Sequence, residues 1–305
     1  MMRYELGKAA QASRPTAPSP TAQEHGAEAP HPLATDQQGP VVIAIANQKG
    51  GVGKTTTSLN LAHALSHRGR RVLVVDLDPQ ANATLAAGVD RVAVGRSGRT
   101  IYNVLLQDRP LADIIQVSAN LSFAVAPSGA NADAAELELA GRTAAELLLR
   151  ARIEDMAPRF DVILLDCPPN LGKLTLNGVL AARYLLIPTE AAAWSMAGIP
   201  LLLGNVDQVR RLYRHDIRLL GIVPTKVRLR VRQDQESLEE LRRDYGDATH
   251  IFPAIRHTTA YAVSEAAGSV TLADNPYAPG VEAYYAIADQ VLVSIARDMT
   301  PAVTS

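Results

Sequence analysis

The sequence predicts an α/β fold with a doubly wound, mostly parallel sheet flanked by helices. Short, continuously apolar runs recur along the chain, and segments with helical character lie between most of them. A parallel strand is covered on both faces, so it reads as an unbroken apolar run rather than as an alternation. In addition, the first run leads directly into a glycine-rich loop that opens the first expected helix, which is the order of elements in a P-loop fold.

The apolar runs define the expected strands, and the segments around them define the expected helices. The strands are expected at residues 41–46, 72–75, 162–165, 185–187 and 219–223. The helices are expected at residues 54–66, 143–156, 195–214, 235–244 and 281–297. Pro200 lacks the amide hydrogen that a helix interior needs, so we expect the third helix to start late or to kink there.

Composition excludes several classes of protein. The 305 residues carry a net charge of -1, so no global field indicates a polyanionic partner, and any such partner must meet a local patch. The single Cys167 excludes an internal disulfide framework and a zinc site made of several thiolates; we expect it to be a small buried residue. No apolar run reaches 18 residues, so no membrane span is expected, and we predict a cytoplasmic location.

Three segments are expected along the chain. Residues 1–40 are rich in proline and alanine but poor in large apolar side chains, so they cannot bury enough surface to offset the entropy of ordering. We predict a disordered tail there. Residues 41–298 are expected to form one domain, and residues 299–305 a flexible C-terminus.

The glycine-rich loop carries the chemistry of a phosphate site. Glycines let successive backbone N–H groups point at phosphate oxygens, and the N-terminus of the following helix adds the positive end of its dipole. Lys54 is expected to reach the β- and γ-phosphates, and the Thr55 hydroxyl to bind Mg²⁺. The strict pattern G-x-x-x-x-G-K-[ST] is missed, because Gln48 occupies the position of its first glycine.

Acidic residues follow two of the expected strands. Asp76 and Asp78 end the second strand, at the edge of the sheet where ligands bind in open α/β folds. Because strand side chains alternate, one carboxylate should face the phosphates and the other should support loops or the water shell of the metal. Asp166 ends the strand at 162–165, as the acid of a Walker B segment does, and is expected to hold Mg²⁺.

The run from Lys49 to Thr55 resembles the deviant Walker A motif of the ParA/MinD class of P-loop ATPases, and Asp76 to Gln80 is similar to a D-x-D-P-Q element of ParA-type proteins. The resemblance implies that Lys49 reaches the nucleotide of a partner subunit in an ATP-dependent homodimer, and that Asp78 positions or activates the attacking water. It implies ATP and Mg²⁺ as cofactors, with a nucleotide site formed by Lys49, Gly50, Gly51, Val52, Gly53, Lys54, Thr55, Thr56, Asp76 and Pro168, and with Lys49, Lys54 and Asp78 in catalysis.

Positive charge is concentrated between residues 208 and 232. This stretch has eight basic residues and one acidic residue, a net charge of +7. Residues 226–232 alternate basic with apolar side chains, so an extended backbone would present four cations on one side, as suits non-specific binding of phosphate backbones. A solvated edge strand or a loop near the adenine ring is the alternative. The expected DNA-binding residues are Arg210, Arg211, Lys226, Arg228, Arg230, Arg232 and, less strongly, Arg256.

The resemblance to ParA-type partition ATPases extends over residues 41 to about 297, includes a likeness of residues 261–266 to a late segment of the family, and implies a DNA-partitioning ATPase. The expected partners are a second copy of the chain, non-specific double-stranded DNA in the nucleoid, and a centromere-binding ParB-type protein that stimulates a slow hydrolysis. A membrane is not expected, because the last helix has no basic polar face. A metabolic ATP-dependent ligase of the same P-loop class is the alternative.

Overall fold

The computed structural model describes residues 39–118, 121–129, 132–156, 159–190 and 198–299. Most of the expected tail and the last six residues lie outside the described residues, so their disorder stays a prediction. No helix in the described ranges combines the length and the apolar character needed to span a membrane.

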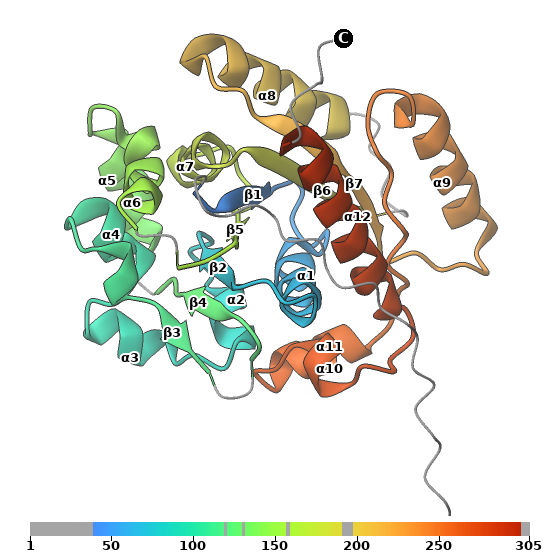
Figure 1. The fold of residues 1–305 in the computed structure, drawn as a ribbon, viewed down its shortest axis with the longest axis horizontal. Helices are drawn as coiled ribbons and strands as arrows, with labels where there is room; N and C mark the ends of the chain where they lie inside the picture. The colour runs from blue at the N-terminus through green and yellow to red at the C-terminus, as the bar shows by residue number, and fades with distance from the viewer. Residues whose placement is uncertain (1–38, 119–120, 130–131, 157–158, 191–197, 300–305) are drawn as a thin grey trace, which may run out of the picture. The chain divides into compact units, whose positions relative to one another are not determined.

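The described strands form one seven-stranded sheet in the order β3-β4-β2-β5-β1-β6-β7 (Figure 1). Neighbouring strands are parallel, except that β3 runs antiparallel to β4. This confirms the predicted fold class. The strands are β1 (Val41–Ile45), β2 (Val72–Asp76), β3 (Gln116–Val117), β4 (Ala124–Ala126), β5 (Val162–Asp166), β6 (Tyr184–Glu190) and β7 (Arg218–Thr225).

Helices connect the strands and flank the sheet. The first half of the chain contains α1 (Lys54–His67), α2 (Asn82–Ala86), α3 (Arg91–Arg96), α4 (Ile101–Leu106), η1 (Leu111–Asp113), α5 (Ala132–Ala140), η2 (Ala145–Leu147) and α6 (Leu148–Glu154). The second half contains α7 (Lys173–Ala181), α8 (Gly198–Tyr213), α9 (Arg232–Tyr245), α10 (Ala260–Ala266), α11 (Thr271–Asp274) and α12 (Glu282–Met299).

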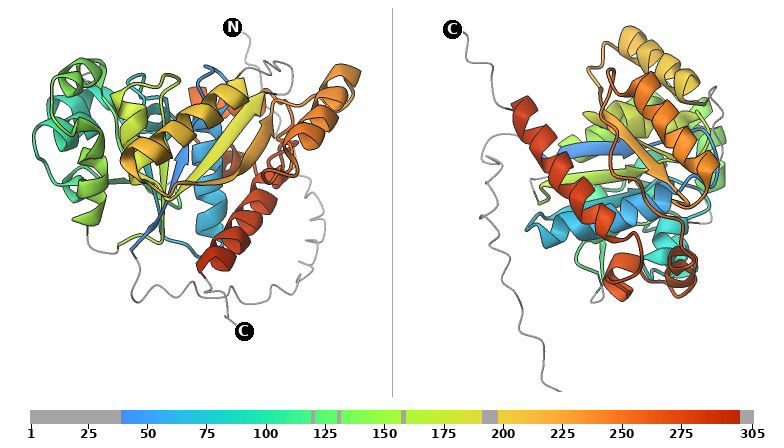
Figure 2. Two further views of the ribbon diagram at one scale, coloured as in Figure 1. Left: turned by 90° about the horizontal axis from the view of Figure 1, so that it is seen from above. Right: turned by 90° about the vertical axis from the view of Figure 1, so that its right-hand side faces the viewer.

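Both faces of the sheet are buried. On the central strand β1, Val42 and Ala44 belong to a core shared with α4 to α8, whereas Val41, Ile43 and Ile45 belong to a core shared with α1, α2, α11 and α12. Figure 2 shows α8 and α12 on opposite faces of the sheet. Coverage on both sides is the physical reason for the unbroken apolar runs in the sequence.

All five expected strands are present, and the expected helices are present with shifted ends. The helix expected at 143–156 is divided, because Ala144 adopts a left-handed φ of 53° and a short 3-10 turn precedes α6. The described part of α8 begins at Gly198, which places Pro200 in its first turn, where no amide donor is needed. Residues 195–197 of that expected helix lie outside the described residues.

Gly221 in β7 is required by a close backbone approach. The register between β6 and β7 shifts at this point, and Gly221 has a φ of 154°. Residue 251 pairs with Ile222 in parallel, so a Cβ atom on Gly221 would lie 2.5 Å from the His250 carbonyl oxygen and 2.6 Å from the Phe252 ring. The His250 carbonyl oxygen accepts from the Ile222 amide at 2.9 Å and the Phe252 ring is buried, so neither can move cheaply.

We therefore expect Gly221→Ala to lower the free energy of unfolding by about 2–4 kcal/mol. Gly204→Ala is the matched control, because Gly204 is exposed in α8 and open space surrounds the position that a Cβ atom would take there. That change should alter stability by less than about 1 kcal/mol, in the stabilising direction. Urea unfolding measures both, and equal stability of the two variants would contradict the packing described for β7.

Candidate functional site

The loop between β1 and α1 is shaped as a cradle for an anion. Gly51 and Gly53 have φ values of 73° and 84°, a conformation that a side chain disfavours. Space around Gly50 and Gly51 is open, so a ligand can approach the backbone there. The loop is anchored from β7, because the Thr225 hydroxyl donates to the Val52 carbonyl oxygen at 2.7 Å.

Lys54, the first residue of α1, is a buried cation. Its exposed fraction is 7%, and its Nζ donates to the Lys49 carbonyl oxygen at 3.1 Å. Burial lowers the pKa of Lys54, while the charges of Asp166 and Asp78 act in the opposite direction. An ammonium group held this way at a helix N-terminus suits a phosphate. The negative phosphate would compensate the ammonium for the water that it loses on burial.

Thr55 and Asp166 bring oxygen ligands together at the same place. The Thr55 hydroxyl donates to Asp166 Oδ2 at 2.8 Å, and the Ser58 hydroxyl donates to Asp166 Oδ1 at 2.9 Å. These hard donors fit Mg²⁺. Within the described residues no group of three or more His, Cys, Asp or Glu side chains could hold a metal by itself, so phosphate oxygens and water would complete the ligand set.

Asp76 and Asp78 have different surroundings, but strand alternation is not the reason, because residues two apart on a strand share a face and β2 ends at Asp76. Asp76 is fully buried and accepts hydrogen bonds from the Thr84 amide at 2.8 Å, the Thr84 hydroxyl at 2.6 Å and the Asp78 amide at 3.1 Å. Burial and the neighbouring Asp166 raise the pKa of Asp76. Asp78 lines the cavity beside the loop, so Asp76 supports the loop and Asp78 faces the ligand space.

Lys49 is turned toward the end of β6. Its Nζ lies 3.6 Å from Glu190 Oε2, and its side chain is 44% exposed. Asn47 fixes the backbone here: its side-chain amide donates to the Pro188 carbonyl oxygen at 2.8 Å, and its Oδ1 accepts from the Lys49 amide at 3.0 Å. A half-exposed ion pair contributes about 1 kcal/mol or less, so Lys49 can exchange Glu190 for another partner at little cost.

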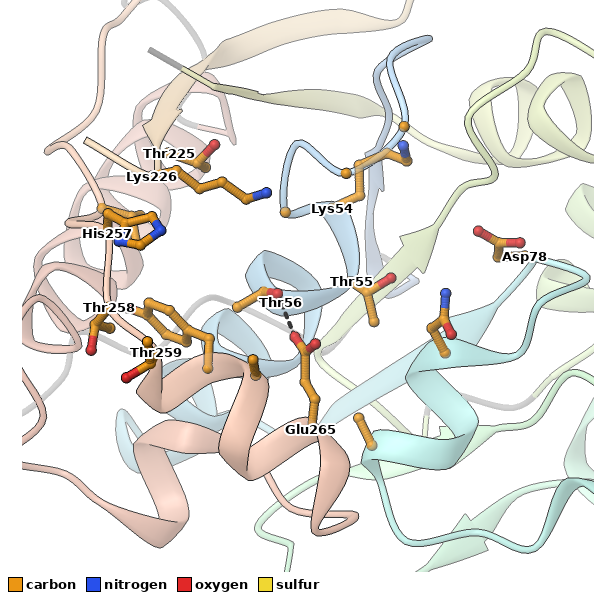
Figure 3. A pocket seen from close by; sticks show the side chains of 18 of the residues that line it. Lys54, Thr55, Thr56, Asp78, Thr225, Lys226, His257, Thr258, Thr259 and Glu265 are labelled. Atoms are coloured by element: carbon orange, nitrogen blue, oxygen red, sulfur yellow. Dashed lines mark hydrogen bonds between the residues drawn. The ribbon is translucent and has the colours of Figure 1, made fainter. Parts of the chain in front are cut away.

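A cavity of about 710 Å³ opens beside this loop (Figure 3). Of the predicted nucleotide-site residues, Gly50, Gly51, Gly53, Lys54, Thr55, Thr56 and Asp78 line it. The lining does not include the predicted residues Lys49, Val52, Asp76, Asp166 and Pro168, although it includes Pro169. The other lining residues are Gln80, Asn82, Leu85, Ala86, Thr225, Lys226, Ile255, Arg256, His257, Thr258, Thr259, Tyr261, Ala262, Glu265 and Tyr284.

The far wall of the cavity was not predicted from the sequence. Residues 255–265 and Tyr284 reach the site through long-range contacts: Ile255 and His257 bond to the backbone at and after the end of β7, α10 packs against α2 and α11, and α12 packs against α1. Parallel pairing of Val227 with Arg256 places this segment beside Lys226, which also lines the cavity. No short motif marks such residues as part of a cavity, and the likeness of residues 261–266 to a family segment did not indicate this location.

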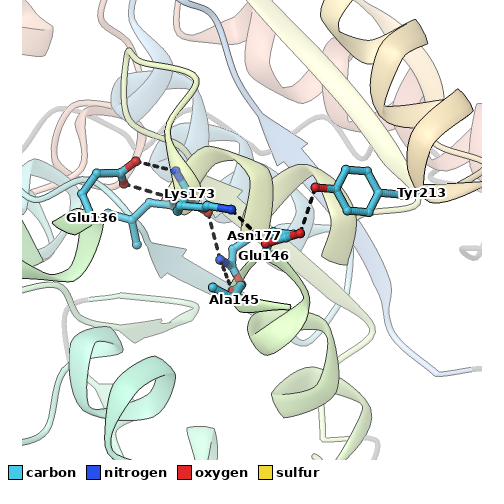
Figure 4. A network of polar contacts seen from close by, with 7 residues as sticks. Glu136, Ala145, Glu146, Lys173, Asn177 and Tyr213 are labelled. Atoms are coloured by element: carbon cyan, nitrogen blue, oxygen red, sulfur yellow. Dashed lines mark hydrogen bonds and ion pairs between the residues drawn. The ribbon is translucent and has the colours of Figure 1, made fainter. Parts of the chain in front are cut away.

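The loop after β5 is held by a polar network around the start of α7 (Figure 4). The Glu136 carboxylate accepts from the backbone amides of Lys173 and Leu174 and so caps the helix. Glu146 receives the Lys173 ammonium at 3.1 Å and the Tyr213 hydroxyl at 2.9 Å. The network joins α5, η2, α7 and α8, and it fixes the helix that follows Pro168 and Pro169.

Cys167 is buried in this region, as expected. Its exposed fraction is 1%, and burial raises the pKa of its thiol far above the ordinary range. A thiol held in the protonated form is a poor nucleophile, which agrees with a packing role.

The basic stretch predicted at 208–232 is not one surface. Arg210, Arg211 and Arg214 lie at the end of α8 or just after it, ahead of β7, whereas residues 226–232 follow β7. β7 has 8 residues, which separates the two groups by about 26 Å along the strand. We call residues Arg210, Arg211, Arg214 and Arg218 the amino-edge group and Lys226, Arg228, Arg230 and Arg232 the carboxyl-edge group.

The prediction of an extended stripe at 226–232 is wrong. Lys226 has a φ of 54°, residues 229–230 form a turn, and Arg232 already begins α9. The cause is the fully buried Asp234, whose carboxylate accepts from the Arg228 amide at 2.7 Å and from its guanidinium at 2.9 Å. A buried carboxylate needs these partners, and they draw the backbone into a turn.

Several of the basic residues already have partners. Arg210 donates to the Ile217 carbonyl oxygen and to Asp207, and Arg232 pairs with Glu236 although its side chain is 90% exposed. Lys226 and Arg256 line the cavity, which agrees with the alternative of a loop near the base of a nucleotide. Arg230 is exposed and makes no ion pair with any residue in the described ranges.

The central β1, the glycine cradle, the buried Lys54 and the Thr55–Asp166 pair define a P-loop nucleotide-binding protein. The sequence profile of the AAA_31 family, described as an AAA domain, matches residues 41–219. The chain therefore belongs to this family. Its relatives place it among the ParA-type P-loop ATPases.

Two relatives are matched over almost their whole length. Sporulation initiation inhibitor protein Soj of Bacillus subtilis (strain 168) is 32% identical over 82% of this chain and 97% of its own. Chromosome-partitioning ATPase Soj of Thermus thermophilus is 37% identical over 83% of this chain and 96% of its own. A solved structure of cobyrinic acid a,c-diamide synthase from Mycobacterium smegmatis, with bound ATP analogue and magnesium, has a TM-score of 0.70 at 31% identity, covering 82% of this chain and 93% of that one.

Because Lys54 is buried, its replacement should affect nucleotide binding and the stability of the fold differently. Since burial disfavours its charged form, Lys54→Met should leave the free energy of unfolding at pH 7 unchanged or higher. The same change should weaken binding of Mg·ADP at least about a hundredfold, because the phosphate loses a desolvated charge partner.

The lowered pKa of Lys54 also predicts a pH dependence. The folded state favours the neutral amine, so wild-type stability should rise as the pH climbs through the folded pKa toward 10.5, and this rise should be smaller in Lys54→Met. Arg211→Met, which removes an exposed cation outside the cavity, is the control and should bind Mg·ADP normally. Calorimetric titration measures Mg·ADP binding, and urea unfolding measures stability. Normal nucleotide binding by Lys54→Met would refute the assigned site.

Proposed function

We propose that this chain is a DNA-partitioning ATPase that works as a switch between a free subunit and an ATP-bound homodimer. ATP and Mg²⁺ bind at the glycine cradle, two subunits close over their nucleotides, and the closed dimer binds double-stranded DNA without sequence preference. Hydrolysis, stimulated by a centromere-binding ParB-type protein, releases the dimer from the nucleoid. The family and the Soj relatives support this proposal.

The observation that carries the proposal is the position of Lys49. Its Nζ lies 3.6 Å from Glu190 Oε2, its side chain is 44% exposed, and it is not among the residues that line the cavity. A lysine needed only by its own loop would be expected to face the cavity, as Lys54 does. A half-exposed lysine beside the cradle is instead available to the phosphates of a facing subunit, since its ion pair with Glu190 is weak.

The remaining residues of the site have defined tasks in this proposal. Lys54 and the loop amides hold the phosphates, and Thr55 with Asp166 would hold Mg²⁺, which supplies charge neutralisation when bound. Asp78 lines the cavity, and its carboxylate also accepts from the Gln80 amide at 3.0 Å, so it is fixed in orientation. A fixed carboxylate facing the ligand space is suited to positioning a water molecule.

The carboxyl-edge group is the better candidate for DNA binding. It lies at the same edge of the sheet as the cavity, so closure of the dimer can change its surroundings, whereas the amino-edge group lies at the opposite edge. Arg230 and Arg232 are exposed there. Lys226 and Arg256 line the cavity, and any effect of these two on DNA would be mixed with an effect on nucleotide binding.

A metabolic ATP-dependent ligase is the second candidate, and the likeness to the cobyrinic acid a,c-diamide synthase structure favours it. Such an enzyme would use ATP to activate a carboxylate, and its ATP consumption would depend on a small substrate. It would have no need to retain DNA. Binding of random duplex DNA in the presence of ATP therefore separates the two proposals.

We expect Mg·ATP to promote binding of the wild-type chain to random duplex DNA, with an affinity that falls steeply as salt rises. The double variant Arg230→Glu/Arg232→Glu should weaken this binding at least about tenfold and reduce the salt slope by about 2, with ATP affinity unchanged. Fluorescence anisotropy of labelled DNA measures both quantities.

The matched control reverses two exposed charges at the other edge, in Arg211→Glu/Arg214→Glu. This variant should bind DNA within about twofold of wild type, because these residues lie about 26 Å from the carboxyl-edge group along β7. Equal loss in both double variants would reject the carboxyl edge as the DNA surface. Absence of any ATP effect on wild-type binding would reject the partition proposal in favour of the ligase.

A further inference from the structure

Glu265 on α10 reaches into the cavity and contacts the first turn of α1. The Thr56 hydroxyl donates to Glu265 Oε1 at 2.5 Å, and both side chains line the cavity (Figure 3). Thr56 follows Thr55, so its hydroxyl lies in the first turn of α1, at the helix end that would face a phosphate. No requirement of the nucleotide chemistry explains a carboxylate here, since Asp78 and Asp166 already supply the acids of the site.

Together with neighbouring contacts, this hydrogen bond connects the α10 region to α1 and to the turn after α2. Besides Thr56, α1 holds the C-terminal region through Asn60, whose Oδ1 accepts from the Leu272 amide at 2.9 Å. The turn after α10 packs directly on the turn after α2, because a Cβ on Gly88 would lie 3.2 Å from the Gly268 carbonyl oxygen. Since α2 carries Thr84, which binds Asp76, α10 lies against the elements that shape the Asp78 loop.

A polyphosphate and the Glu265 carboxylate compete for the same surroundings. A threonine hydroxyl has one proton to donate, so Thr56 cannot donate to Glu265 and to a phosphate oxygen at once. The carboxylate is also a negative charge on the wall of a cavity that is to receive a polyanion, and like charges repel more strongly in a partly buried site than in water.

We propose that Glu265 is a positioning residue of the nucleotide site: it holds the Thr56 hydroxyl until a polyphosphate takes over that donor, and its release loosens α10. The segment before α10, which includes Arg256 and His257, also lines the cavity, so release of α10 carries the state of the phosphate site to the basic residues of that wall. This inference rests on the proposed nucleotide binding, and it does not depend on DNA or on the partner protein.

The test uses Mg·ADP and the full-length chain. Glu265→Gln keeps an acceptor for Thr56 and removes the charge, so it should bind Mg·ADP about three- to tenfold more tightly than wild type at about 50 mM salt. The difference should shrink at about 500 mM salt, because screening weakens the repulsion in the wild type. A purely structural role for Glu265 would produce no such salt dependence. Glu240→Gln, an exposed carboxylate on α9, is the matched control and should bind as wild type.

Hydrogen exchange tests the release of α10. In the wild type, Mg·ADP should accelerate amide exchange over residues 260–267. In Glu265→Ala the exchange there should already be fast without nucleotide, and Mg·ADP should add nothing. Affinity of Glu265→Gln equal to or weaker than wild type, or exchange over 260–267 that ignores Mg·ADP in the wild type, would overturn the inference alone. A wild-type chain that fails to bind Mg·ADP would overturn the proposed function as well.

Discussion

The site depends on one constraint, the burial of the Lys54 ammonium at the N-terminus of α1. The chain can hold this cation out of water because the Lys49 carbonyl oxygen accepts from it and because Asp166 and Asp78 lie near it. Glycines 51 and 53 adopt the left-handed φ values that bring the loop around it. A cation with so little solvent and no direct carboxylate contact among the described residues is poised for an anionic ligand.

The topology of the sheet places the other groups around that cation. β1 lies between β5 and β6, and β2 pairs with β5, so the carboxyl ends of β1, β2 and β5 meet at one edge. Asp166 and Asp76 are paired in register on adjacent strands; Thr84 donates to Asp76, and Thr55 and Ser58 donate to Asp166. Lys49 points to the end of β6, outside its own cradle, and this position is the basis of the proposed site shared by two subunits.

The sequence predicted the fold and the phosphate half of the site because both depend on local signals. Unbroken apolar runs report burial on two faces, and the glycine spacing before Lys54 reports a loop conformation. β3 and β4 were missed since strands of two and three residues carry too short a pattern. Glu265 and Tyr284 could not be assigned to the cavity, because long-range packing alone brings them there. The stripe at 226–232 failed because Asp234, just beyond it, controls the backbone of Arg228.

Mixed dimers decide whether Lys49 acts on the nucleotide of the other subunit. Lys49→Ala and Asp78→Ala chains are each expected to be nearly inactive in ATP hydrolysis. When they are mixed, the site of the Lys49→Ala subunit keeps its own Asp78 and receives Lys49 from the Asp78→Ala subunit, so the account predicts that turnover returns. If Lys49 acted within its own subunit, neither site of the mixed dimer would be complete. A mixture as inactive as its components would then contradict the account.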